Sequence, residues 1–233
     1  MSTALTGTPS GAPHRPGTDP SLRPEPAVAA ELAGAENLLR RRARETGAAP
    51  ALPCALTTAA GEFRLRPVRP ADLPLLTGWM NDPAVAAYWS LDGPAERTER
   101  HVGAQLAGDG RSTPCLGLLD GTPMSYWEVY RADLDPLARH YRARPHDTGI
   151  HLLLGPPDAR GRGLGSILLT ALADHLLRYA PRLVGEPDVR NVPSVRAFRN
   201  AGFRRVAELR LPDKRAVLMT RRPAPPTRRT APA

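Results

Sequence analysis

A strand–loop–helix segment near the middle of the chain constrains the fold more than any other feature. Residues 148–154 are strongly apolar and predict a strand, and residues 164–179 predict a helix. Between them lie Gly161, Gly163 and, at the start of the helix, Gly165, and such glycines let the backbone approach a ligand closely. A helix N-terminus also attracts phosphate through its N–H groups and its dipole. The segment therefore predicts a site for a phosphate-containing ligand, with an ordinary tight turn as the alternative.

Two common nucleotide-binding motifs do not fit this loop. A Rossmann fingerprint needs the first strand of the sheet and an acidic residue about twenty positions later. Here the loop follows four or five predicted strands, which argues against a dinucleotide fold. A Walker A loop is excluded because no Gly-Lys-Ser/Thr sequence follows the glycines.

The surrounding pattern predicts one α/β domain built around a mixed sheet. The hairpin signal Asp120-Gly121 joins two of its strands. The expected order of elements is strand 63–68, helix 71–80, helix 94–107, strands 114–119 and 124–130, strand 148–154, helix 164–179, strand 182–186, helix 192–200, and strands 204–210 and 215–220.

Both ends of the chain differ in composition from this region. Of the 27 prolines, eight lie within residues 1–60 and four in the last twelve positions. We therefore expect residues 1–61 to be a disordered extension with one possible helix at 28–45. The domain is expected to span residues 62–220, and residues 221–233 a disordered basic tail.

The net charge of +9 does not by itself indicate nucleic-acid binding, because the chain uses 31 arginines and a single lysine. Residues 61–220 carry 22 basic and 18 acidic residues, without arginines interleaved with aromatics. This mild excess suits a phosphorylated or acyl-coenzyme ligand. The sequence has no apolar run of about 18 residues and no secretory signal. We expect a cytoplasmic monomer or weak homodimer with two free cysteines, binding neither nucleic acid nor membrane.

A second segment, residues 191–203, carries Asn191, Phe198 and the pair Gly202-Phe203 on and after a predicted helix. Together with the arginine-led glycine loop, it resembles the GNAT acyltransferases over about residues 62–220. Their acyl-CoA pyrophosphate loop reads Arg/Gln-x-x-Gly-x-Gly/Ala, which this chain matches with Arg160, Gly163 and Gly165. The resemblance implies a mixed, mostly antiparallel sheet with a central V-shaped splay, flanked by helices. Acyl-CoA is then expected between the strands near 148–154 and 182–187.

Further segments resemble the siderophore-biosynthesis branch of this family, the aerobactin, desferrioxamine and mycobactin type of lysine or cadaverine N-acyltransferases. They are residues 79–83, 88–89, 123–130, 147–151, 185–191 and 211–216. The branch acylates the side-chain nitrogen of lysine, ornithine, cadaverine or their N-hydroxy forms. The resemblance implies acetyl-CoA or succinyl-CoA as donor and no metal. One departure is Gly78, where the branch often has His before the Trp.

The resemblance also implies which residues hold the acyl-CoA. Backbone N–H groups near Leu153 or Leu154 are expected to hold the thioester carbonyl. The cofactor-binding set is Leu153, Leu154, Arg160, Gly161, Gly163, Leu164, Gly165, Ser166, Ser194 and Phe198. Many GNAT enzymes have Tyr at the position of Phe198, where it protonates the departing thiolate. Phe198 has no proton to donate. Either Ser194 or water protonates the thiolate, or the reaction uses no specific acid.

His151 and Asp188 are the expected catalytic pair, since they lie near the ends of the two splayed strands. A pair of this kind holds and deprotonates an incoming amine. The alternatives are a packed histidine and an aspartate that caps the following helix. Asn191 is both a candidate substrate ligand and a candidate cap. The substrate-binding set is His151, Trp127, Glu128 and Asn191.

Glu128 lies on a strand between Trp127 and Tyr130, and we expect it to face away from both aromatic residues. It then binds the distal ammonium of a diamine or is an ordinary surface acid. Trp89 and Trp127 either wall the aliphatic chain of the substrate or pack in the core.

These observations predict an acyl-CoA-dependent N-acyltransferase that acylates an N-hydroxylated diamine or lysine side-chain nitrogen to a hydroxamate. The alternatives are a GNAT enzyme acting on an aminoglycoside or a protein amine, and a non-catalytic acyl-CoA-binding module.

Overall fold

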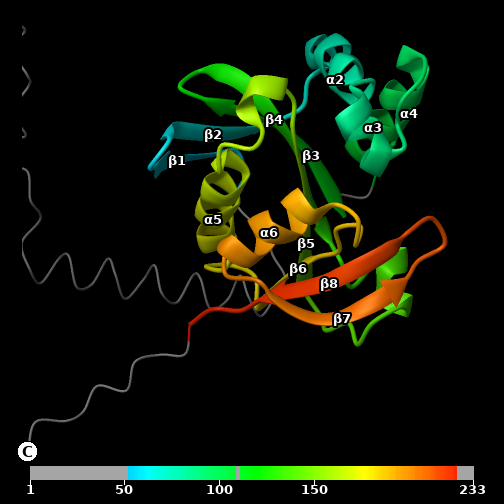
Figure 1. Ribbon diagram of the computed structural model, residues 1–233, viewed down its shortest axis with the longest axis vertical. Coiled ribbons are helices and arrows are strands. Elements are labelled where there is room, and N and C mark those ends of the chain that lie inside the picture. Colours follow the sequence, from blue (N-terminus) through cyan, green and yellow to red (C-terminus); the bar gives the residue numbers. More distant parts are fainter. Residues whose placement is uncertain (1–51, 109–110, 225–233) are drawn as a thin grey trace, which may run out of the picture. The chain divides into compact units, whose positions relative to one another are not determined.

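A computed structural model describes residues 52–108 and 111–224 of the chain. These residues form one sheet of eight strands in the order β1-β2-β3-β4-β5-β6-β8-β7, with helices on both faces (Figure 1). The strands are β1 (Cys54–Thr58), β2 (Gly61–Pro67), β3 (Ser112–Leu119), β4 (Thr122–Arg131), β5 (Asp147–Leu154), β6 (Arg182–Gly185), β7 (Arg204–Arg210) and β8 (Arg215–Arg221). The α-helices are α2 (Leu73–Met80), α3 (Pro83–Trp89), α4 (Ala95–Leu106), α5 (Leu164–Leu176) and α6 (Val192–Asn200). In this part of the chain, no helix is long and apolar enough to cross a bilayer.

The sheet splays at its centre, between β5 and β6. Every other neighbouring pair of strands is antiparallel, whereas β5 and β6 run parallel. Their pairing covers only Asp147 to Gly149 on β5, which face Arg182 to Val184 on β6. Beyond Gly149 the two strands separate. The predicted mixed, mostly antiparallel sheet with a V-shaped splay is therefore confirmed.

The sheet begins earlier in the chain than predicted. Strand β1 pairs with β2 from Cys54 opposite Leu65, and the side chains of Cys54 and Leu56 pack against the core. The expected boundary at residue 62 is therefore wrong, because residues 54–58 belong to the sheet. The possible helix at 28–45 and the tail beyond residue 224 lie outside the described residues.

Helix α3 is a second element that the sequence pattern missed. Asp82 caps it, since its side chain accepts a hydrogen bond from the Ala84 N–H at 2.9 Å, and Pro83 occupies the first helical position. The helix ends at Trp89, followed by Ser90 in a left-handed conformation. It thereby carries Trp89 toward the splayed centre of the sheet.

Alternating side chains divide the sheet into two faces with different coverings. On the first face, Trp127 and Ile150 pack in a core cluster with residues of α5 and α6. On the second face, Tyr126 and Leu153 pack in a separate cluster with residues of α2, α3 and α4. Figure 1 shows these two groups of helices in different regions of the fold. His151, between Ile150 and Leu152 on β5, points to the second face.

A buried ion pair closes the narrow end of the V. Asp147 is fully buried and accepts a hydrogen bond from Arg182 Nε at 2.7 Å, while Arg182 Nη2 contacts its second oxygen. The Tyr141 hydroxyl donates to the same carboxylate at 2.9 Å, and the guanidinium lies 5.6 Å from the Tyr141 ring centroid. Asp147 and Arg182 are also the first residue pair in the parallel pairing of β5 with β6.

Removing one member of this pair should destabilise the fold strongly. We expect Asp147→Ala to lower the free energy of unfolding by about 3–5 kcal/mol, because the Arg182 charge is left buried without a partner. The double variant Asp147→Leu/Arg182→Met should recover much of that loss, because no buried charge is left unpaired. Urea unfolding of the three proteins measures both effects. A single variant as stable as the wild type contradicts this account.

Candidate active site

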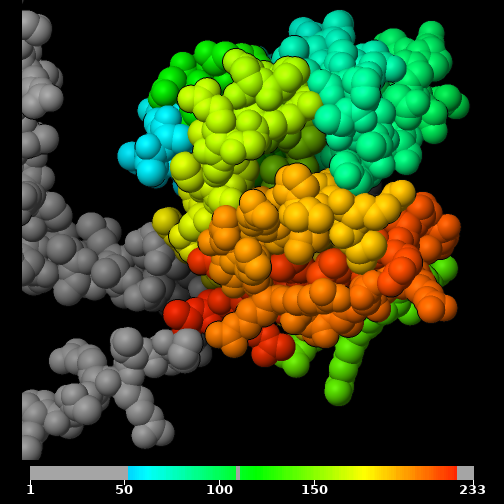
Figure 2. All heavy atoms as spheres, in the orientation of Figure 1, coloured from blue at the N-terminus to red at the C-terminus, as the bar shows by residue number. Residues whose placement is uncertain are grey.

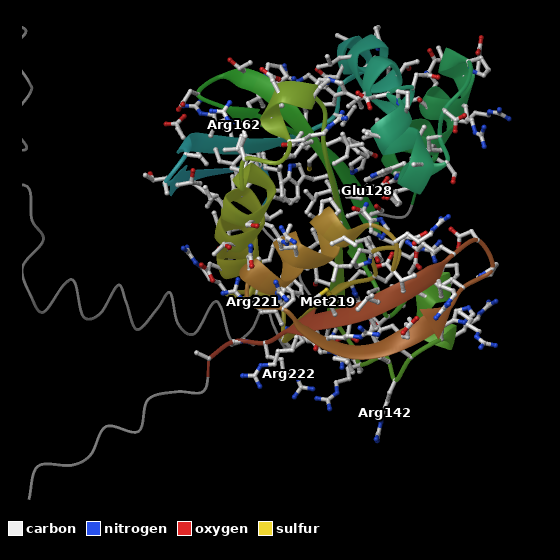
Figure 3. All side chains as sticks on the ribbon, viewed as in Figure 1. Glu128, Arg142, Arg162, Met219, Arg221 and Arg222 are labelled. Atoms are coloured by element: carbon white, nitrogen blue, oxygen red, sulfur yellow. The ribbon has the colours of Figure 1, made fainter. Side chains whose placement is uncertain are left out.

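A cluster of charged side chains lies on the second face of the sheet, where β5 and β6 separate. Glu128 comes from β4 and His151 from β5, while Glu186 follows the end of β6 directly. Lys214 comes from the turn between β7 and β8. In Figure 3, Glu128 lies between helices α2–α4 and strands β7 and β8. Figure 2 shows the surface hollowed between those helices and the yellow-orange segment that leads into α6.

His151 lies between two carboxylates. Its Nδ1 is 2.9 Å from Glu128 Oε2, and its Nε2 contacts Glu186 Oε1. Burial alone would lower the pKa of His151, but the two carboxylates outweigh it and raise the pKa from 6.5 to about 10. The ring is therefore an imidazolium at neutral pH, although its side chain is 33% exposed. Both ring nitrogens are engaged, so neither offers a lone pair to a substrate.

Glu128 is held as a carboxylate by donors from three elements. Its Oε1 accepts hydrogen bonds from Gln105 Nε2 at 2.7 Å and from the Tyr126 hydroxyl at 2.9 Å. His101 Nε2 lies 2.6 Å from the same oxygen. Burial would raise the pKa of Glu128, but the contacts with His101 and His151 hold it well below the usual range. With 5% of its surface exposed, Glu128 is not a surface acid.

The expected orientation of Glu128 is correct with respect to Trp127 and wrong with respect to Tyr130. Residues two apart on a strand share a face, so Glu128 lies on the same face as Tyr130 and opposite Trp127. Tyr130 accordingly reaches the cluster, where its hydroxyl lies 3.2 Å from His151 Nε2.

Glu186 and Lys214 are the members of the cluster that the sequence analysis did not name as site residues. Glu186 makes the closer contacts. Besides His151, it contacts the Tyr130 hydroxyl at 2.9 Å and Lys214 Nζ at 3.5 Å. Burial would raise its pKa, but the charge of His151 outweighs burial and lowers the pKa to about 2. A signal was present, since Glu186 directly follows the uncharged run Leu183-Val184-Gly185 and shares a face with Val184.

Asp188 is not the partner of His151 that we expected. Its carboxylate accepts hydrogen bonds from the Arg190 backbone N–H at 2.8 Å and from Arg190 Nε and Nη2 at 3.0 and 2.8 Å. The hydrogen bonds from the Arg190 side chain outweigh burial and, with the Arg190 backbone N–H and the charges of Arg190 and Lys214, keep the pKa of Asp188 below its ordinary value. Asp188 therefore forms a local turn with Arg190, and Glu186 takes the place beside His151.

Asn191 caps α6, as one of its two predicted roles required. Its side-chain oxygen accepts a hydrogen bond from the Ser194 N–H at 3.1 Å, so Ser194 lies in the first turn of that helix. The amide oxygen of Asn191 is thus already occupied by the backbone.

The two tryptophans have different surroundings. Trp127 is fully buried on the first face, 5.6 Å from Phe63 by ring centroids, and its indole N–H donates to Ser125 Oγ at 2.8 Å. The structure therefore corrects the expectation that Trp127 lines the substrate. Trp89 is half-buried, and its ring centroid lies 6.1 Å from that of His151. Of the two, Trp89 is the one beside the cluster.

The predicted coenzyme loop begins α5 on the first face. Gly161 and Gly163 have φ of 73° and 81°, and Gly163 is the N-cap of the helix. No atom lies within 4 Å of a Cβ added at Gly163, so the space beside this backbone is open. At Gly165 an added Cβ would lie 3.8 Å from the Leu154 side chain and 3.9 Å from Ala197. The remaining predicted residues, Leu164 and Ser166, lie in the same first turn of α5.

Arg160 ties this loop to two neighbouring elements. Its Nε donates to the Leu154 carbonyl at 2.9 Å, and its Nη2 donates to the Gly155 carbonyl at 2.5 Å. Its Nη1 donates to Asp82, the N-cap of α3, at 2.9 Å. The guanidinium therefore connects the end of β5, the glycine loop and the start of α3.

The other predicted coenzyme residues lie along the splay. Leu153 and Leu154 belong to the part of β5 beyond the β6 pairing, with Leu153 buried and Leu154 half-buried. Phe198 of α6 is 3% exposed, and its ring packs so closely on Gly185 that an added Cβ would lie 2.2 Å from it. Phe198 thus covers the first face of β6. In the described chain, no group of His, Cys, Asp and Glu has the arrangement of a metal site.

Comparison with known proteins agrees with this geometry. Residues 69–211 match the family model of the acetyltransferase (GNAT) domain. The chain is 36% identical over 159 residues to the lysine N-acyltransferase MbtK of Mycolicibacterium paratuberculosis, which covers 67% of this chain and 72% of that protein. It is 34% identical over 149 residues to the N(6)-hydroxylysine O-acetyltransferase of Escherichia coli, covering 63% and 47% respectively.

A solved structure extends the comparison to three dimensions. The crystal structure of the aminoglycoside acetyltransferase AAC(6')-Ib in complex with coenzyme A matches with a TM-score of 0.60 at 26% identity, covering 69% of this chain and 94% of that one. The family match spans more than half of the chain, and the relatives are enzymes of acyl transfer. The chain is therefore an enzyme of the GNAT acetyltransferase family, and it belongs with the siderophore-biosynthesis branch of that family.

Proposed function

We propose that the enzyme transfers an acyl group from acetyl-CoA or succinyl-CoA to the side-chain nitrogen of an N-hydroxylated lysine or diamine. The product is a hydroxamate, the iron-chelating group of a siderophore. The names of the lysine and N-hydroxylysine relatives support this class of substrate.

The donor and the acceptor approach the splay from opposite faces of the sheet. The glycine loop at the start of α5 gives the coenzyme pyrophosphate an open backbone surface beside Gly163. The acyl group then extends along the unpaired part of β5. The acceptor enters from the second face, beside His151 and Trp89. The coenzyme A complex of the aminoglycoside acetyltransferase supports this placement of the donor.

The contacts of His151 with Glu128 and Glu186 are the observation that carries the proposed substrate. An alkylammonium has a pKa of about 10.4, so at pH 7 only on the order of one molecule in 10³ is the reactive free amine. A general base normally removes that proton, but His151 is already protonated and both its nitrogens are engaged. An N-hydroxylated amine is far less basic, because its oxygen withdraws electrons, and it arrives unprotonated. The site therefore suits a hydroxylamine.

The reaction needs no covalent enzyme intermediate. The acceptor nitrogen attacks the thioester carbonyl carbon, the carbon–sulfur bond breaks, and coenzyme A leaves as the thiolate. The nitrogen loses its proton to water. Phe198 provides no proton for the thiolate, which is a tolerable leaving group. The lysine N-acyltransferase relative favours unhydroxylated lysine as the second candidate, and direct assay separates the two.

Gly163→Val should weaken acyl-CoA binding while the fold is retained. The added side chain occupies the open space where backbone is expected to meet pyrophosphate. Gly121→Val is the matched control, because Gly121 also has φ of 81° and no atom within 4 Å of an added Cβ. We expect equal losses of stability, but a loss of affinity of about tenfold or more only at Gly163. Equal affinities in calorimetry contradict the placement of the coenzyme.

N6-hydroxylysine or N-hydroxycadaverine should be acylated with a higher kcat/KM than the corresponding unhydroxylated amine. The free-energy cost of deprotonating the plain amine is roughly 4 kcal/mol at pH 7, and the hydroxylamine avoids it. Thiol release with each acceptor measures the difference. Equal or better turnover of the plain amine rejects the hydroxamate reaction, as does activity only with a sugar or peptide amine.

His151 should remain protonated across the neutral range. Its contribution to stability is fully present below pH 6.5, the unperturbed value, and is lost as pH rises through about 10. His151→Gln should therefore cost more free energy of unfolding at about pH 6 than at about pH 10. The exposed His140→Gln is the control. The imidazole NMR signal that disappears in His151→Gln should keep its protonated shift up to about pH 9, and a midpoint near 6.5 would refute the assignment.

A further inference from the structure

We propose that Lys214 binds a carboxylate of the substrate and makes the enzyme prefer carboxylate-bearing substrates. The carboxylate comes either from an amino-acid acceptor, as opposed to a diamine, or from a dicarboxylic acyl donor such as succinyl-CoA. The inference rests on the proposed function, since it concerns which substrate that reaction takes.

Lys214 is the only lysine in a chain with 31 arginines. It lies in the turn between β7 and β8, which is closed by a hydrogen bond from the Leu211 N–H to the Lys214 carbonyl at 2.9 Å. The next residue, Arg215, is also fixed, because its carbonyl accepts a hydrogen bond from the Val189 N–H at 2.9 Å. The one ammonium side chain of the sequence is thus held at the charged cluster.

The contacts of Lys214 leave donors available. Its Nζ lies 3.5 Å from Glu186 Oε1, and its side chain is 21% exposed. An ammonium has three N–H donors, and among residues 52–108 and 111–224 Glu186 is the one carboxylate that lies within 4 Å of Lys214 Nζ. The neighbouring cation, Arg190, is instead held against Asp188. Lys214 is therefore the cation of the cluster that can accept a second anionic partner.

The charges of the cluster explain why a carboxylate needs Lys214. Glu128 and Glu186 are both buried carboxylates that share His151, and His101 contacts only Glu128. Without Lys214, Glu186 has only the cation that it shares with Glu128, and its charge repels an acidic substrate. With Lys214, an ammonium lies beside Glu186, whereas His151 has no free N–H to offer. The ammonium is thus the group that offsets this repulsion.

The geometry of lysine also suits this role better than that of arginine. A guanidinium pairs with a carboxylate through two parallel N–H donors, so an arginine at this position would be directed at Glu186. The three donors of an ammonium diverge around one atom and can serve two carboxylates at once. A single lysine in an arginine-rich chain is what such shared binding requires.

The test pairs two acceptors with two donors. Wild type, Lys214→Met and Arg215→Met are assayed with N6-hydroxylysine or N-hydroxycadaverine, each with acetyl-CoA or succinyl-CoA. Arg215→Met is the matched control, because it removes the positive charge of the neighbouring residue, whose side chain is 67% exposed and paired with Glu208. We expect Lys214→Met to lower kcat/KM by about tenfold or more only where a carboxylate is present, as a charge-assisted hydrogen bond implies. Arg215→Met should leave every preference unchanged.

The pattern of losses identifies the source of the carboxylate. A loss confined to N6-hydroxylysine assigns Lys214 to the acceptor, and one confined to succinyl-CoA assigns it to the donor. Equal losses in all four pairings mean that Lys214 is only a counter-ion of Glu186, which overturns the proposal.

Binding measurements keep the two proposals separate. If no pairing releases thiol, the proposed function fails, and calorimetry still compares the affinities of the same four compounds. Tighter binding of a carboxylate-bearing compound that disappears in Lys214→Met supports carboxylate recognition. Equal affinities in the wild type reject it.

Discussion

The ion pair of Asp147 with Arg182 fixes the point from which the functional part of the molecule opens. The two residues are the first pair in the parallel pairing of β5 with β6, and the side chain of Asp147 is fully buried. Three residue pairs later the strands separate, and the edge of β5 loses its β6 neighbour. A buried pair of opposite charges tolerates little displacement, because each charge depends on the other. The narrow end of the V is thereby held in place, while its wide end is where we propose that the substrates bind.

The cluster at the wide end shows how two carboxylates can stay charged beneath the surface. Each would be neutralised by burial alone, but each receives several donors. His151 links the two, and Tyr126 and Tyr130 supply neutral hydroxyls from alternate positions of β4. In the proposed reaction, the imidazole therefore contributes charge and position and is not the proton acceptor, since both its nitrogens are engaged.

Much of the fold followed from local sequence patterns, as did the positions of His151 and Glu128 in the candidate site, and the failures have physical causes. The glycine loop was found because Gly161 and Gly163 reflect a local backbone requirement. Strand β1 was missed because it has only five residues, which is too few to show a clear alternation of apolar and polar side chains. Its pairing with β2 makes it a strand. Asp188 was predicted in place of Glu186 because both acids follow β6, two residues apart, and the sequence does not show which of them reaches His151. The path of the chain after β6 brings Glu186 to His151 and leaves Asp188 with Arg190.

The alternation of β5 has a consequence for how such an enzyme can change. Ile150 contributes to the face covered by α5 and α6, whereas His151 and Leu153 contribute to the face covered by α2, α3 and α4. Neighbouring positions in the sequence thus serve different ligands of the proposed reaction. Substitutions confined to the second face can alter the choice of acceptor while the coenzyme surface stays intact. Because alternate side chains of β5 face opposite sides of the sheet, donor binding and acceptor choice can evolve separately, and one donor site can serve different acceptors in related enzymes.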